Sequence, residues 1–219
     1  MDRILIAPST DPAKTEKDLV EYIHNIQAYA DFLHCDVMDG LFVSRKTISY
    51  DTIALIKQNC LLPLDVHLMV ENPMPVLGKY AESGANIITV HYESFESGAE
   101  FFNAIKHIKK LGCLAGVSVK PQTKIQEIYD VLEIVDLVLV MSVEPGKSGQ
   151  HFMSETLTKI SELNDIRVRN GYKFLIEVDG GINNENCSQI INSGADVLVS
   201  GNYVYSADDK KVAIESLRV

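Results

Sequence analysis

Eight short, almost wholly apolar runs recur along this chain, and longer stretches with helical periodicity separate them. Apolar runs of this length, bounded by turn residues, are typical of parallel strands that are buried on both faces. Helix-like stretches lie between them, for example over residues 99–111 and 154–166. The eight predicted strands cover residues 4–8, 32–37, 64–69, 87–91, 114–119, 137–143, 174–179 and 197–201.

Three glycines mark the ends of predicted helices. Gly84, Gly112 and Gly194 each follow a helical pattern and precede an apolar run, in S-G-A-N-I-I-T-V, L-G-C-L-A-G-V-S-V and S-G-A-D-V-L-V-S. Glycine is favoured just beyond a helix because it adopts a left-handed conformation without strain. The repeated order of helix, glycine and strand indicates a repeating β/α unit.

Eight such units in 219 residues predict an α/β fold, a single-domain (β/α)8 TIM barrel over residues 1–219. A doubly wound open sheet is the alternative. The G-x-G-x-x-G phosphate signature of that fold is absent, and the first predicted strand runs into A-P-S-T-D-P instead. The barrel is therefore the favoured architecture.

Charge and hydropathy limit the function classes. The formal net charge is −10, which disfavours a nucleic-acid binder. No apolar run approaches the roughly 18 residues that a membrane span needs, and the start of the sequence lacks the apolar core of a signal peptide. The four cysteines form no C-x-x-C pair. We expect a cytoplasmic protein with reduced thiols and no membrane or nucleic-acid partner.

Four side chains that bind divalent metals lie at or near predicted strand ends: His34, Asp36, His67 and Asp179. His34 and Asp36 are two residues apart and therefore point to the same face of one strand. Active sites of (β/α)8 barrels gather at the carboxyl ends of the strands, where the four would meet. Two imidazoles and two carboxylates suit one divalent ion of zinc, iron, manganese or cobalt. A structural role for any one of them, as a core histidine or a surface aspartate, is the alternative.

The two carboxylates of this set suggest a proton-transfer reaction. Asp36 follows the second predicted strand and Asp179 the seventh, so they approach the barrel axis from different sides. Such a pair could remove a proton from one face of a carbon and return it to the other, while the metal stabilises an enediolate. A catalytic Asp36–Asp179 pair is therefore expected.

Glycines cluster after the last predicted strands, in E-P-G-K-S-G-Q, V-D-G-G-I and S-G-N-Y. The loops after the seventh and eighth strands are the usual phosphate site of these barrels, although glycine also serves ordinary turns. Met38, Met69 and Met141 could form an apolar wall beside the metal or fill the core. His91 is interpreted as a histidine that supports the site or packs in the core, and His24, His107 and His151 as surface residues.

The chain resembles the ribulose-phosphate 3-epimerase family over nearly its whole length. The shared phrases are I-A-P-S, L-H-C-D-V-M-D-G, P-L-D-V-H-L-M-V, G-A-N-I-I-T-V-H, L-V-L-V-M-S-V-x-P-G-x-x-G-Q, I-E-V-D-G-G-I and G-A-D-V-L-V-S-G.

The resemblance implies a metal-dependent isomerase that interconverts ribulose 5-phosphate and xylulose 5-phosphate and commonly self-associates as a homo-oligomer. It also implies a metal site of His34, Asp36, His67 and Asp179, with Asp36 and Asp179 as the acid/base pair. The implied contacts to the sugar phosphate are Ser9, His67, Gly146, Lys147, Ser148, Gly149, Gly180, Gly181, Gly201 and Asn202.

The loops depart from the family's pattern at seven positions: Pro12, Arg45, Lys120, Glu144, Lys147, Ser148 and Asn202. Because substrate specificity resides in loops, we hypothesise that the preferred substrate is another ketose phosphate, such as allulose 6-phosphate. A non-catalytic sugar-phosphate binder is a second alternative. Decarboxylase or aldolase chemistry is disfavoured, since D-V-M-D-G offers no lysine to protonate a carbanion.

Overall fold

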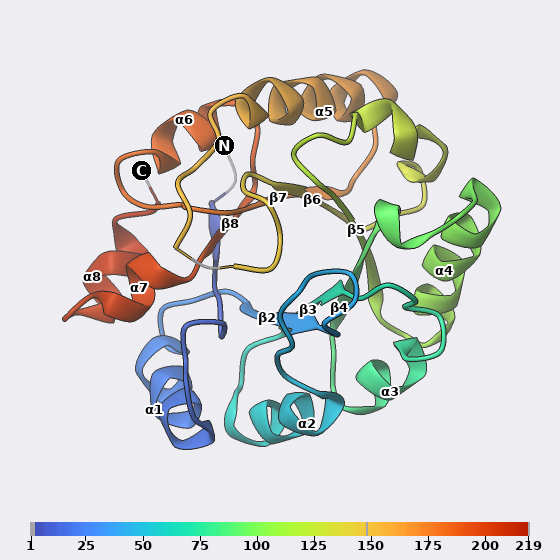
Figure 1. Ribbon diagram of the computed structural model, residues 1–219. Coiled ribbons are helices and arrows are strands. Elements are labelled where there is room, and N and C mark those ends of the chain that lie inside the picture. The colour runs from blue at the N-terminus through green and yellow to red at the C-terminus, as the bar shows by residue number, and fades with distance from the viewer. Residues whose placement is uncertain (1–2, 148, 219) are drawn as a thin grey trace.

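Eight parallel strands form one sheet that curls into a barrel, and helices surround it on the outside (Figure 1). The computed structural model describes residues 3–147 and 149–218. The strand order is β1-β8-β7-β6-β5-β4-β3-β2, so the predicted (β/α)8 architecture is confirmed. The strands are β1 Leu5–Pro8, β2 Leu33–Met38, β3 Leu64–Met69, β4 Ile87–His91, β5 Leu114–Val119, β6 Leu137–Met141, β7 Leu175–Asp179 and β8 Val197–Ser200.

The barrel closes between its first two strands through a short seam. A single bridge pairs Ser9 with His34, and the Thr10 amide donates to the His34 carbonyl at 2.9 Å. By contrast, β1 and β8 pair over four residues, from Leu5 opposite Val197 onward. The seam therefore lies beside a predicted metal ligand.

Helices follow most of the strands, and local sequence sets where they begin and end. The Thr15 side chain caps α1 by accepting from the Asp18 amide, and Ser97 caps α4 in the same way from Glu100. The α-helices are α1 Glu16–Ile26, α2 Tyr50–Asn59, α3 Leu77–Glu82, α4 Gly98–Lys110, α5 Thr156–Asn170, α6 Cys187–Asn192, α7 Asn202–Ser206 and α8 Lys210–Glu215, and a 3-10 turn, η1, covers Tyr92–Ser94. In the part of the chain that the structure describes, no helix is long and apolar enough to cross a membrane.

The connection between β5 and β6 carries a 3-10 helix, η2 Ile125–Val131. Its apolar residues Ile125, Ile128 and Val131 are all buried and recur every three residues. A 3-10 helix has three residues per turn, so this spacing aligns all three on one face. The alternation of strand and helix is thus kept with a tighter helix in this unit.

Side chains of the strands alternate between two cores. Outward residues such as Leu33, Cys35 and Val37 of β2 join the large core between sheet and helices. The barrel interior has an apolar part built from β6, β8 and β1, which includes Leu139 and Val199. The buried polar residues on β2, β3, β4 and β7 are His34, Asp36, Asp65, His67, Thr89, His91 and Glu177. Buried charged groups need partners, so this polar cluster inside the barrel indicates the position of a functional site.

Candidate active site

The structure brings the four predicted metal donors together. One nitrogen or oxygen atom from each of His34, Asp36, His67 and Asp179 lies within 4.8 Å of the others. Strand β2 supplies His34 and Asp36, β3 supplies His67 beside Asp36 in register, and Asp179 is the last residue of β7. Both histidines are fully buried. The cluster is therefore built on strands, which hold side chains more rigidly than loops do.

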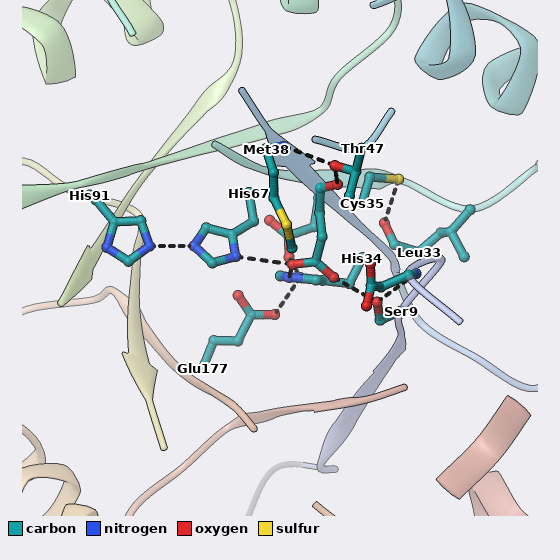
Figure 2. A network of polar contacts seen from close by, with 12 residues as sticks. Ser9, Leu33, His34, Cys35, Met38, Thr47, His67, His91 and Glu177 are labelled. Carbon is teal, nitrogen blue, oxygen red and sulfur yellow. Dashed lines mark hydrogen bonds and ion pairs between the residues drawn. The ribbon is translucent and has the colours of Figure 1, made fainter. Parts of the chain in front are cut away.

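His34 has the arrangement of a metal ligand. Its Nδ1 lies 2.5 Å from Oδ2 of Asp65, and a carboxylate can only accept, so Nδ1 carries the proton. Its Nε2 is buried without a hydrogen-bond partner and lies 3.3 Å from Oδ1 of Asp36. Figure 2 shows His34 beside Ser9 and below His67. A carboxylate behind one nitrogen, with the other nitrogen free of hydrogen bonds and facing the donor cluster, is the usual setting of a ligating histidine, so the residues present fit a divalent metal.

The two aspartates have opposite electrostatics. Burial alone would raise the pKa of Asp36, but His34 and His67 together hold it well below its usual range. Burial and the neighbouring Asp36 carboxylate raise the pKa of Asp179 to about 7. The Ser9 hydroxyl donates to Oδ2 of Asp36 at 2.7 Å and favours its ionised form. One carboxylate is therefore kept ionised while the other tends to hold a proton.

The histidines have pKa values shifted in different directions. Burial disfavours the charged form of His34, but Asp36 and Asp65 raise its pKa well above the usual value. Burial lowers the pKa of His67, and it lowers that of His91 to about 4. Nε2 of His91 lies 2.9 Å from Nε2 of His67, as Figure 2 shows. The expectation that His91 supports or packs against the site agrees with this position.

Two buried acids beneath the cluster were missed in the sequence. Asp65 lies behind His34, and Glu177 lies 4.0 Å from the same nitrogen. Burial, with the nearby Asp65, raises the pKa of Glu177 well above its usual value. Each acid precedes a predicted ligand by two residues, Asp65 before His67 and Glu177 before Asp179. The strand alternation that paired His34 with Asp36 could have found both.

A cavity of about 690 Å³ opens above the cluster. Asp36 and Asp179 lie in its wall together with Met38, Met69 and Met141, whereas His34 and His67 are wholly buried. Ser148 lies outside the described residues. The other predicted substrate contacts apart from His67 line the cavity: Ser9, Gly146, Lys147, Gly149, Gly180, Gly181, Gly201 and Asn202.

Two adjacent glycines bring the loops of this cavity close together. Gly180 and Gly181 follow β7 with φ values of 129° and 66°. A Cβ on Gly181 would lie 2.6 Å from the Gln150 carbonyl oxygen and from the Phe152 amide nitrogen. Only glycine therefore lets the loops after β6 and β7 pack against each other, with bare backbone facing the cavity.

The loop departures separate into two groups. Lys147, Glu144 and Asn202 line the cavity. Arg45 instead makes two contacts to Asp11, at 2.7 and 2.9 Å, and lines a second hollow of about 340 Å³.

Lys120 and Pro12 are not among the residues that line the cavity. The ammonium of Lys120 lies 4.1 Å from the ring centre of Phe42. Pro12 packs near Gly201. Arg45 is not among these residues either, so only some of the described positions that depart from the family's pattern face the cavity.

Among the histidines expected on the surface, His24 and His151 are exposed and His107 is half-buried. His151 also lines the cavity, as do Asn183, Glu185 and Asn186. These four were missed because they lie in loops whose paths the sequence does not specify.

The fold and the site together define a (β/α)8-barrel protein with a candidate metal centre at the carboxyl ends of its strands. Solved structures of the same fold include a tryptophan synthase alpha-subunit from Pyrococcus furiosus, with a TM-score of 0.70 and 11% identity over 99% of this chain and 98% of that one. Orotidine 5'-phosphate decarboxylase from Pyrococcus horikoshii aligns with a TM-score of 0.68 and 14% identity over 98% and 97%. At these identities the likeness concerns the fold alone.

Sequence comparison is more specific. The ribulose-phosphate 3 epimerase family profile matches residues 5–205. A ribulose-phosphate 3-epimerase from Aquifex aeolicus is 40% identical over 88% of this chain and 86% of its own length, and one from Bacillus subtilis is 42% identical over 86% of each. One from Helicobacter pylori is 37% identical over 94% and 95%. The chain therefore belongs to the ribulose-phosphate 3-epimerase family and is an isomerase.

Proposed function

We propose that this chain is a metal-dependent 3-epimerase that interconverts ribulose 5-phosphate and xylulose 5-phosphate. The observation that carries the proposal is the juxtaposition of two carboxylates and two imidazoles, within 4.8 Å, beside a cavity lined by glycine-rich loops. The names of the bacterial relatives supply ribulose phosphate as the substrate and C3 as the reacting carbon, and xylulose 5-phosphate is the C3 epimer of ribulose 5-phosphate.

One divalent ion of zinc, iron, manganese or cobalt suits this donor set. His34, Asp36, His67 and Asp179 would hold it, with His34 presenting Nε2 because Asp65 occupies its Nδ1. When bound, the ion would act as a Lewis acid on substrate oxygens and stabilise the charge that follows proton removal.

Asp36 and Asp179 then act as the two bases. They stand on β2 and β7 and both line the cavity, so a sugar between them presents one face of C3 to each. The carboxylate that is ionised removes the C3 proton, and the protonated one supplies a proton to the opposite face. The opposite pKa shifts of the two groups match this division, and the reverse reaction exchanges the roles.

The glycine-rich loops would hold the phosphate. Backbone amides approach an anion closely at glycines, and Gly180 and Gly181 line the cavity. Lys147 adds a positive charge in the same cavity, and Asn202 an amide. Holding the phosphate there orients the sugar toward the aspartates.

The test is proton NMR of metal-loaded protein with ribulose 5-phosphate in deuterated water. We expect xylulose 5-phosphate to form with deuterium at C3, because both aspartates exchange their protons with solvent. Absence of conversion and of C3 exchange, with bound metal confirmed by elemental analysis, would refute the proposal.

One observation favours an alternative, a 3-epimerase that acts on a different ketose phosphate. Lys147, Glu144 and Asn202 differ from the family's pattern and face the cavity, so they could fit a different phosphorylated ketose such as allulose 6-phosphate. A panel of ketose phosphates in the same NMR assay discriminates these cases by the best kcat/KM. Binding without C3 exchange for every member would instead indicate a non-catalytic sugar-phosphate binder.

A further inference from the structure

A second histidine and an acid continue the site away from the cavity. His91 is the last residue of β4 and is fully buried. Its Nε2 lies 2.9 Å from Nε2 of His67, and its Nδ1 lies 3.0 Å from Oε2 of Glu93. A line of hydrogen bonds therefore runs from His67 through His91 to Glu93, and Figure 2 shows its two histidines.

The order of donors along this line follows from the chemistry of its end. The Glu93 carboxylate can only accept, so Nδ1 of His91 donates to it. The uncharged His91 ring then has a lone pair on Nε2 and accepts from Nε2–H of His67. This leaves the lone pair of His67 on Nδ1, which lies 3.3 Å from Oδ1 of Asp36. That nitrogen is the one that faces the cluster of donors.

Glu93 is itself held in place from the far side. Its Oε1 accepts from the Lys120 amide at 2.8 Å and from the Thr123 hydroxyl. Lys159 of α5 donates to three backbone carbonyls of the same loop, including those of Lys120 and Thr123. Because the loop after β5, which donates to Glu93, is itself tied to α5, the carboxylate has a fixed position against His91.

Packing restrains the His91 ring as well. The Phe42 ring packs on it with 4.7 Å between ring centres, and the centre of the hydrogen-bonded His67 ring lies 4.9 Å away. Rotation of either imidazole would break the hydrogen bonds and this packing together. Both rings are therefore restricted to the orientation described.

We propose that His91 and Glu93 are positioning residues, which hold His67 in the tautomer and orientation that present Nδ1 to the metal. The assignment rests on the proposed function only through the location of the metal among His34, Asp36, His67 and Asp179. It parallels the role of Asp65 at His34, with the difference that a histidine relays the carboxylate.

His91→Phe separates positioning from packing, since it keeps a buried ring and removes both nitrogens. Metal-free protein is titrated with cobalt(II), and the visible absorption reports both affinity and ligand geometry. Loss of a partner behind a ligating histidine costs roughly 10- to 100-fold in metal affinity. We expect that loss in His91→Phe, with a changed cobalt spectrum. Wild-type affinity and spectrum in this variant would overturn the proposal.

Glu93→Ala provides a second variant that leaves both histidines in place, in case the altered core of His91→Phe does not fold. We expect a weaker cobalt site here as well. Two-bond proton–nitrogen NMR of the metal-free protein should show His67 as the Nε2–H tautomer in the wild type and as a mixture of the Nε2–H and Nδ1–H tautomers in Glu93→Ala. Glu96→Ala is the matched control, because it removes an exposed acid three residues further along the same loop. An unchanged tautomer in Glu93→Ala would refute the relay.

These measurements need no substrate, so a failure of the proposal about His91 and Glu93 can be distinguished from a failure of the proposed function. A wild type that binds cobalt, with both variants weakened, supports the relay even if no sugar phosphate exchanges its C3 proton. A wild type that turns over ribulose 5-phosphate while His91→Phe binds cobalt normally supports the function and overturns the relay. A wild type that binds no cobalt overturns the relay.

Discussion

Gly181→Ala tests the tight approach between the loops after β6 and β7. The new Cβ would lie 2.6 Å from two backbone atoms, at Gln150 and Phe152. Ordinary contact begins near 3.4 Å, so the loop after β6 must move by about 0.8 Å. The φ of 66° adds a strain of about 1–2 kcal/mol for a residue with a Cβ.

A displacement of this size at a binding loop costs roughly 10²-fold in rate. We therefore expect kcat/KM for ribulose 5-phosphate to fall by about that factor, while the metal donors on β2, β3 and β7 stay in place. The assay is steady-state kinetics with coupled detection of xylulose 5-phosphate, together with cobalt(II) titration to verify the metal site.

Gly171→Ala is the matched control, because Gly171 has a φ of 69° and no atom within 4 Å of the new Cβ. It carries the same backbone strain at the end of α5 without moving a cavity loop. Both variants should lose thermal stability, Gly181→Ala the more because of its added contact, and only Gly181→Ala should lose kcat/KM. Equal kcat/KM in the two variants would refute the reasoning from loop contact.

Three further predictions follow from the site. Asp36→Asn and Asp179→Asn should each lower kcat by at least ~10²-fold. Elemental analysis of each variant distinguishes a loss of proton transfer from a loss of metal. Near-normal turnover with metal bound would contradict the two-base mechanism. Chelation should abolish turnover and lower Tm, and added divalent metal should restore both; full activity in the chelated protein would exclude a metal requirement. Burial would raise the pKa of Glu93, but the hydrogen bond from His91 lowers it from 4.5 to about 2. Ionised Glu93 therefore stabilises the folded protein by about 3 kcal/mol above pH ~4.5, and this contribution is lost as the pH falls toward 2. Denaturant unfolding of Glu93→Gln should show that deficit at pH 7 and a smaller one at pH 3; a deficit independent of pH would contradict the linkage.

The strands and the clustering of the four candidate metal donors were predictable because both depend on local periodicity. The apolar runs placed every strand to within two residues at each end, and alternation along β2 placed His34 and Asp36 on one face. The partners of Arg45 and Lys120 were not predictable, because Asp11 lies 34 positions from Arg45 and Phe42 is on a different loop. Loop side chains have no periodicity that would specify their direction, so only the structure could show which of the departing loop positions face the cavity. Self-association stays a prediction.

The pairing of β1 with β8 has a consequence for how the protein is made. Leu5 lies opposite Val197, so the barrel cannot close until almost all of these residues are available. Contacts of such long sequence separation slow folding, and unpaired strand edges expose the chain to aggregation until they form. Asp36 and Asp179 come from early and late strands in the same way. During synthesis, the nascent chain therefore carries Asp36 long before Asp179, and we expect the epimerase to gain activity only in a late, cooperative step that also removes its last sheet edges.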